Sequence, residues 1–219
     1  MKKGISVWSF QPASYAENFA LAKQAGFEGV ELSLDAGGEL SLSSTKEDVK
    51  RLKQSADAAG TEFYSVATGL YWSNYFTSDD KLERERTKDI AKKQLELASM
   101  LGCDTILVVP GATGVDFAPD FGVVTYRDAY ERALEAMQEM APIEENYRVS
   151  IGVENVWKKF LLSPLEMQRF IDEVGSSFVG SYFDVGNVLA FGYPEHWISI
   201  LGEKLKRCIL RILNAVSET

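Results

Sequence analysis

The sequence predicts an α/β fold in which strand–helix units repeat around a parallel sheet. Three observations lead to this prediction. Short apolar runs alternate with amphipathic segments along nearly all of the 219 residues. Glycine follows several of the amphipathic segments, where a left-handed C-cap ends a helix. The run 105–109 is apolar without alternation, as expected of a strand covered on both faces.

The elements follow one another in regular order. Strands are predicted at residues 4–8, 29–34, 62–68, 105–109, 149–154, 179–184 and 207–213. Helices are predicted at 15–25, 47–59, 80–101, 126–145, 164–174 and 195–205. Seven parallel strands fit either an open doubly wound sheet or a barrel. No Gly-x-Gly-x-x-Gly or Walker-type loop follows the first strand, which disfavours a nucleotide-binding sheet.

Composition limits the classes of function. The chain is 46% hydrophobic with no composition break, so we expect one domain over residues 1–219. A net charge of -9 disfavours nucleic acid and anionic membranes as partners. No apolar run is long enough to span a bilayer and no secretory signal is recognisable, so we expect a cytoplasmic protein. Cys103 and Cys208 are expected to be free, buried thiols.

Polar residues gather where the predicted strands end, at Glu31, Thr68, Glu154 and Asp184. In a barrel this edge carries the active site. Glu154 and Asp184 follow neighbouring strands, and two carboxylates there can share a divalent cation. The alternatives are a salt bridge from Glu154 to a Lys or Arg, and a turn or helix cap at Asp184. The two segments taken together favour a site.

Segments 154–157 (Glu-Asn-Val-Trp) and 183–187 (Phe-Asp-Val-Gly-Asn) resemble the Glu-Asn and Asp-x-Gly-Asn segments of the sugar phosphate isomerases and epimerases. These enzymes form part of the xylose isomerase-like TIM barrel family. Segments 26–32 and 101–106 are also similar, and the resemblance covers roughly residues 4–207. It implies a (β/α)8 TIM-barrel type of fold, here with about seven strands and without the eighth βα unit.

The resemblance also implies site residues. Glu154 would be the catalytic acid/base and a metal ligand, and Asp184 a second ligand, for Mn, Co, Mg or Zn. Glu31, Asn155 and Asn187 would contact a ketose or ketose phosphate. Trp72 follows the third strand, where a loop could cover the apolar face of the sugar. The alternatives are a strand-end salt bridge for Glu31 and packing for Trp72. The implied reaction removes a proton next to a carbonyl, through an enediolate that the metal stabilises.

Three further aromatic positions are assigned structural roles. We expect His196, the only histidine, at the surface. Trp8 and Trp157 are assigned to core or lid packing.

The last predicted strand departs from the family pattern. It lacks the histidine ligand expected there in a His-x-Lys-Asp segment, and a later glutamate ligand is also missing. Codons for residues 208–214, read in a shifted frame, can spell His-Phe-Lys-Asp-Phe-Lys. We therefore interpret residues 208–219 as an aberrant tail; the alternative is a naturally diverged or shortened end.

Three expectations follow from this departure. A divalent metal would be held weakly by the remaining ligands. Exposed barrel edges would favour a homo-oligomer. The alternative to an active isomerase or epimerase is a non-catalytic or vestigial sugar-binding protein.

Overall fold

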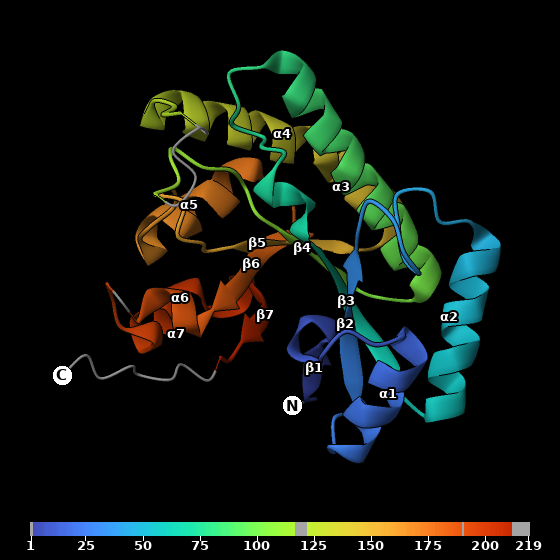
Figure 1. Cartoon of the computed structure of the whole chain (residues 1–219). Helices are drawn as coiled ribbons and strands as arrows, with labels where there is room; N and C mark the ends of the chain where they lie inside the picture. Colours follow the sequence, from blue (N-terminus) through green and yellow to red (C-terminus); the bar gives the residue numbers. More distant parts are fainter. Residues whose placement is uncertain (1, 117–121, 190, 212–219) are drawn as a thin grey trace.

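The computed structural model describes residues 2–116, 122–189 and 191–211. Seven parallel strands form one sheet in chain order. Their bounds are Gly4–Ser6 (β1), Gly29–Leu34 (β2), Glu62–Thr68 (β3), Thr105–Val108 (β4), Ser150–Glu154 (β5), Val179–Asp184 (β6) and Leu205–Ile209 (β7). The sheet curls as in a TIM barrel, and among the described residues β1 pairs only with β2 and β7 only with β6 (Figure 1). The predicted seven-stranded barrel-type fold is confirmed.

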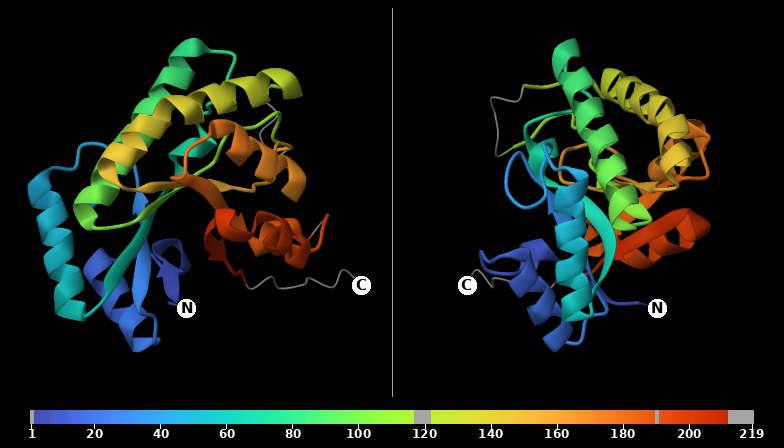
Figure 2. Two further views of the ribbon diagram at one scale, coloured as in Figure 1. Left: turned by 180° about the vertical axis from the view of Figure 1, so that it is seen from behind. Right: turned by 90° about the vertical axis from the view of Figure 1, so that its right-hand side faces the viewer.

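Helices surround the outer side of the sheet in chain order (Figures 1 and 2). Their bounds are Tyr15–Gln24 (α1), Lys46–Ala59 (α2), Lys81–Leu101 (α3), Tyr126–Tyr147 (α4), Pro164–Val174 (α5), Val185–Val188 (α6) and Pro194–Leu201 (α7). Short 3-10 turns occur at Val7–Ser9 (η1), Gly69–Trp72 (η2) and Gly202–Lys204 (η4). No described helix is long and apolar enough to cross a membrane.

Local sequence signals set the ends of these helices. Ser14 and Thr45 each form a capping box with the third helical residue, Glu17 and Asp48 respectively. Gly60 ends α2 in the left-handed conformation with a φ of 68°, as predicted. Because these caps satisfy backbone groups locally, the sequence alone located most helix ends.

Buried side chains fill both faces of the sheet. All six residues of β2 and all six of β6 are buried, which explains their mostly apolar composition. On the inner side Gly152 of β5 makes room for an aromatic ring. A Cβ at Gly152 would lie 2.7 Å from Cδ2 of Tyr182. This glycine therefore lets the Tyr182 ring lie across the interior, where its hydroxyl reaches β2.

The structure corrects several predicted bounds. The first strand ends at Ser6, because its side chain accepts a hydrogen bond from the Trp8 backbone and starts η1. The last strand is 205–209 rather than 207–213, because Gly202 takes a φ of 49° and helix α7 stops at Leu201. Residues 212–213 of that prediction, and 212–219 of the predicted aberrant tail, lie outside the described residues.

Both cysteines are free, as predicted. Cys103 is buried, but Cys208 is exposed, so the expected burial of the second thiol is wrong. The reason is its place on β7, whose outer edge has no partner strand among the described residues. His196 lies on the surface of α7, as expected.

Candidate functional site

Glu154 and Asp184 end neighbouring strands at the same edge of the sheet. Glu154 is the last residue of β5 and Asp184 the last of β6. The register pairs Glu154 with Tyr182, so Asp184 lies two residues further along β6 and on the same face as Tyr182. Asp184 is fully buried and Glu154 only 7% exposed. The strand register therefore brings the two predicted carboxylates together.

The guanidinium of Arg211 contacts both carboxylates. Its Nε donates to Oδ2 of Asp184 at 2.5 Å, and a terminal nitrogen lies 3.7 Å from Oε1 of Glu154. The other oxygen of Asp184, Oδ1, accepts a hydrogen bond from the Asn187 backbone at 3.1 Å. Asp184 thus caps α6 and forms an ion pair at the same time. The two structural alternatives, a salt bridge from Glu154 to an arginine and a helix cap at Asp184, are therefore both present at the site.

Burial raises the pKa of Glu154 to about 8, and the adjacent Asp184 adds to this shift. Arg211 opposes it, because a positive charge favours the ionised carboxylate. A carboxyl group with a pKa near neutrality can both accept and return a proton.

The structure also brings in Lys158, a residue that the sequence analysis missed. Its side chain is fully buried, and Nζ donates to the backbone oxygen of Tyr71 at 2.7 Å. The same nitrogen lies 4.1 Å from the ring centre of Trp72 and 4.5 Å from that of Tyr75. Burial lowers the pKa of Lys158 to about 7, and Glu154 opposes this shift. In sequence Lys158 begins a Lys-Lys pair, which gives no sign of burial.

Two of the residues assigned to substrate hold the strand ends together. Asn155 donates from Nδ2 to the Asp184 backbone oxygen at 2.9 Å and accepts from the Asp184 backbone nitrogen at 2.8 Å. Asn187 donates from its side chain to the Asn155 backbone oxygen at 2.8 Å. Both side chains are buried. They position Asp184 beside Glu154, and their contact with a substrate stays a prediction.

Glu31 lies within β2 rather than at its end, so its predicted place at the strand terminus is wrong. It is the third of six residues in that strand. Oε2 accepts hydrogen bonds from Ser65, at 2.9 Å, and from the Tyr182 hydroxyl. Burial raises its pKa, while these hydroxyl groups oppose the shift. Glu31 therefore belongs to a buried network that joins β2, β3 and β6 beneath the edge.

Three tryptophans are half-exposed around the strand ends. Trp72 of η2 is 45% exposed, Trp8 of η1 is 53% exposed, and Trp157, after β5, is 50% exposed. Trp157 donates to the Asn187 backbone oxygen at 3.2 Å, and Trp8 donates to Oγ of Ser33 at 3.0 Å. Of the two packing roles expected for Trp8 and Trp157, core packing is wrong, because hydrogen bonds hold these half-exposed rings at the surface, and packing in a lid stays a prediction.

The described residues do not fit a resident divalent cation. Among residues 2–116, 122–189 and 191–211 no group of three or more His, Cys, Asp or Glu side chains is placed to hold a metal. The two carboxylates that come together already share the Arg211 guanidinium. An oxygen-coordinated divalent ion usually takes six or more ligands, and these side chains offer two.

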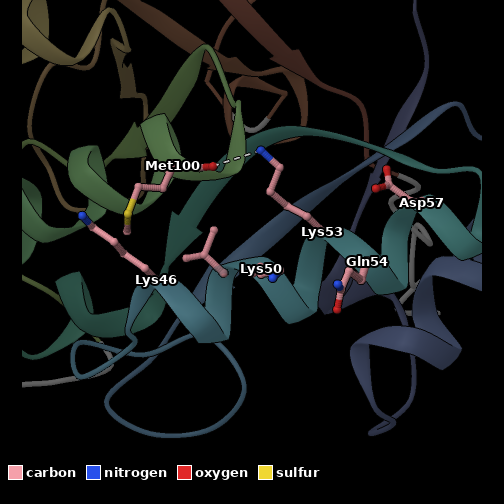
Figure 3. Close-up of a pocket in the computed structure, with 7 residues that line it drawn as sticks. Lys46, Lys50, Lys53, Gln54, Asp57 and Met100 are labelled. Atoms are coloured by element: carbon pink, nitrogen blue, oxygen red, sulfur yellow. Dashed lines mark hydrogen bonds between the residues drawn. The ribbon is translucent and has the colours of Figure 1, made fainter.

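A separate groove lies on the outer surface between α2 and α3. It has a volume of about 490 Å³, and Lys46, Lys50 and Lys53 of α2 line one side (Figure 3). Lys53 donates to the Met100 backbone oxygen at 3.2 Å. None of the predicted site residues lines this groove.

The fold agrees with the family comparison. The model of the xylose isomerase-like TIM barrel family matches residues 19–208, and the chain belongs to this family. Its members include sugar epimerases, and this chain is similar to several proteins named as such.

Two relatives are proteins named for L-ribulose-5-phosphate 3-epimerase activity. The chain is 26% identical to the protein from Haemophilus influenzae over 94% of its own length and 71% of the relative. It is 28% identical to the protein from Escherichia coli over 82% of its own length. It spans only 61% of that second relative.

Solved structures share the fold. A D-psicose 3-epimerase, determined in the presence of D-fructose, superposes with a TM-score of 0.81 at 18% identity. The match covers 95% of this chain and 72% of that one. An L-ribulose 3-epimerase gives a TM-score of 0.80 at 19% identity, over 95% of this chain and 69% of that one. At these identities the likeness shows the fold alone.

Proposed function

We propose that this chain is a sugar epimerase or isomerase that acts on a ketose or ketose phosphate. The observation that carries the proposal is the buried pair Glu154–Asp184 at the carboxyl edge of the sheet, in a chain of this family. Active sites of barrel enzymes lie at this edge. The printed names of the relatives, ketose and ketose-phosphate 3-epimerases, support the substrate class.

Glu154 is the proposed proton-transfer group. It is a buried carboxyl group beside the two positively charged side chains Arg211 and Lys158, which influence its ionisation. Abstraction of the proton next to a ketose carbonyl leaves an enediolate, and return of a proton to the opposite face gives an epimer. Abstraction from C1 instead, with return of the proton to C2, gives the aldose. The half-exposed rings of Trp8, Trp72 and Trp157 offer flat apolar surfaces for a sugar.

A divalent metal could take part in this reaction only if Arg211 no longer occupied the two carboxylates. Glu154 and Asp184 are the side chains that would hold it, and the Arg211 guanidinium would first have to leave them. An ion at this place would polarise the substrate carbonyl. We expect the metal to bind weakly, because Arg211 competes with it for Glu154 and Asp184.

The test is hydrogen exchange and turnover with a panel of ketoses in D₂O. The panel contains L-ribulose, D-psicose, D-tagatose, D-fructose and L-ribulose 5-phosphate, each with and without Mn²⁺. We expect deuterium at the epimerised carbon, and Glu154→Gln should reduce its incorporation by about 100-fold or more. Glu166→Gln, on the outer helix α5, is the matched control. Turnover that is equal in Glu154→Gln and wild type would exclude this role for Glu154.

A non-catalytic sugar-binding protein is the second candidate. The observation that favours it is the Arg211 guanidinium, which engages both carboxylates. Saturable binding of a ketose with neither exchange nor turnover, under all the conditions above, would select this candidate.

A homo-oligomer is also proposed, because β1 and β7 each have one partner strand among the described residues. Unpaired strand edges are templates for association. Sedimentation velocity of the full chain over a range of concentrations tests this part of the proposal.

A further inference from the structure

Lys158 is fully buried, although it lies in the turn that follows β5. Its neighbours Trp157 and Lys159 are both exposed, so the chain directs only one of its two adjacent lysines into the fold. Lys159 has a φ of 54°, a left-handed conformation that is costly for any residue except glycine. A strained turn therefore holds the Lys158 side chain inward, and such strain often accompanies a functional role.

The ammonium of Lys158 holds the segment 69–75, which follows β3. Nζ donates to the Tyr71 backbone oxygen at 2.7 Å and lies 4.1 Å from the centre of the Trp72 ring and 4.5 Å from that of Tyr75. The faces of aromatic rings attract an ammonium group, most strongly where water is excluded. Because Lys158 is fully buried, its ammonium meets the Trp72 ring from the inner side, and 45% of Trp72 stays exposed.

The part of this segment that Lys158 grips is itself fixed to the sheet. Tyr71 is buried, and its hydroxyl donates to Oε1 of Gln94 at 2.9 Å. The amide nitrogen of Gln94 donates to the backbone oxygens of Val66 in β3, at 2.7 Å, and Leu107 in β4, at 3.0 Å. The carbonyl group that accepts from Lys158 is therefore a rigid anchor.

The backbone around Lys158 also holds the segment that follows β4. The backbone nitrogen of Thr113 donates to the Lys158 backbone oxygen at 3.1 Å, and the Thr113 hydroxyl donates to the Lys159 backbone oxygen at 2.8 Å. Lys158 thus joins the chain segments that follow β3, β4 and β5. These segments leave the same edge of the sheet at which Glu154 ends β5.

We propose that Lys158 is a positioning residue, whose buried ammonium locks segment 69–75 in place and so presents Trp72 to the ketose. The inference rests on the proposed function and adds to it the residue that places the sugar platform. A ring fixed before the sugar arrives does not have to be ordered on binding, which favours affinity. An apolar side chain at position 158 could neither donate to the Tyr71 carbonyl nor attract the Trp72 ring.

The first test measures the dissociation constants of D-psicose and L-ribulose 5-phosphate by calorimetry. Lys158→Met and Trp72→Ala should each weaken binding by about tenfold, and the double variant should bind no more weakly than either, because both changes remove the same platform. Lys158→Arg keeps a cation beneath the ring and should lose less affinity than Lys158→Met. Lys159→Met, at the exposed neighbouring lysine, is the control and should bind as wild type does. Unchanged affinity in Lys158→Met, or a double variant weakened by the product of the two single effects, would overturn the proposal.

The second test needs no sugar. Hydrogen–deuterium exchange of peptides that span residues 69–75, followed by mass spectrometry, reports how often this segment opens. Lys158→Met should exchange there several-fold faster than wild type, and Lys159→Met should match wild type. Equal exchange in Lys158→Met and wild type would overturn the positioning role. Failure of wild type to bind any ketose would instead contradict the proposed function, and exchange would still decide whether Lys158 holds the segment.

The third test keeps Lys158 itself unchanged, so it does not depend on whether Lys158→Met folds. Reductive methylation modifies accessible amines, and peptide mapping follows each lysine. Trp72→Ala should increase the rate at Lys158 by about tenfold, because the ring that covers the ammonium is gone, and should leave the rate at Lys159 unchanged. An unchanged rate at Lys158 would show that Trp72 and Lys158 do not hold each other, and would overturn the proposal.

Discussion

Asn155 and Asp184 are joined by two reciprocal hydrogen bonds, although Asn155 directly follows β5 and Asp184 ends β6. The Asn155 amide donates to the Asp184 carbonyl at 2.9 Å, and its oxygen accepts from the Asp184 backbone nitrogen at 2.8 Å. Through this pair the end of β5 holds the end of β6. The carboxylate of Asp184 is thereby directed toward Glu154 and Arg211, so the site depends on an amide that is itself buried.

Replacement of Asn155 by alanine should destabilise the fold. It leaves a buried N–H and a buried C=O of Asp184 without partners, with an expected loss of about 3 kcal/mol in the free energy of unfolding. Urea denaturation of the variant and of the wild type measures this loss in the free energy of unfolding. Asn146→Ala, at an exposed position of α4, is the control and should change stability by less than about 0.5 kcal/mol. Equal unfolding midpoints in the two variants would contradict the structural role of Asn155.

Replacement of Tyr182 by phenylalanine should weaken the buried network beneath the site. The lost hydroxyl donates to Glu31 and also lies 3.0 Å from the Ser65 hydroxyl. We expect a loss of about 1–3 kcal/mol at neutral pH, because a buried carboxylate loses a donor. Tyr193→Phe, at a largely exposed position, is the control. A Tyr182→Phe variant as stable as wild type would show that the network does not depend on this hydroxyl.

Glu144 of α4 should make stability fall as the pH rises. Its side chain is fully buried, neither carboxylate oxygen has a hydrogen-bond partner among the described residues, and burial raises its pKa to about 7. Because the folded chain holds this proton more tightly than the unfolded chain, stability should decline between the two pKa values, from about pH 4.5 to about pH 7. Above that range the penalty stays constant.

Glu144→Gln tests this expectation. Thermal unfolding across the pH range should show the variant more stable than wild type above about pH 7 and nearly equal to it near pH 4.5. Glu145→Gln, the exposed neighbour, should follow the wild-type curve. Curves of Glu144→Gln and wild type that stay parallel would show that Glu144 does not change protonation on folding.

Lys158 should report its own ionisation through tryptophan fluorescence. Its Nζ lies 4.1 Å from the centre of the Trp72 ring, and burial lowers its pKa to about 7. Loss of the ammonium charge as the pH rises through about 7 should therefore change the Trp72 emission. The transition should disappear in Lys158→Met and in Trp72→Phe, and persist in Lys159→Met. A transition that persists in Lys158→Met would assign it to another group.

The sequence predicted the elements whose signals are local. The strand at 179–184 and the helix at 164–174 were located to the residue, because apolar runs, a serine cap and a closing glycine mark them. The last strand was placed two residues late, because its start depends on the backbone of Gly202. The position of Glu154 and Asp184 at neighbouring strand ends was expected from chain order, since neighbouring parallel strands end at the same edge.

By itself the sequence determined the order of strands and helices through periodicity and caps. Its short motifs indicated the barrel family and the carboxylates at the sheet edge, because all these signals are written in contiguous residues. Only the tertiary structure decided what surrounds those carboxylates. Lys158 is buried among Tyr71, Trp72 and Tyr75, and Arg211 contacts Asp184; both sets of contacts join residues far apart in the chain. Such contacts depend on the curl of the sheet and the path of the loops, which local sequence patterns do not specify.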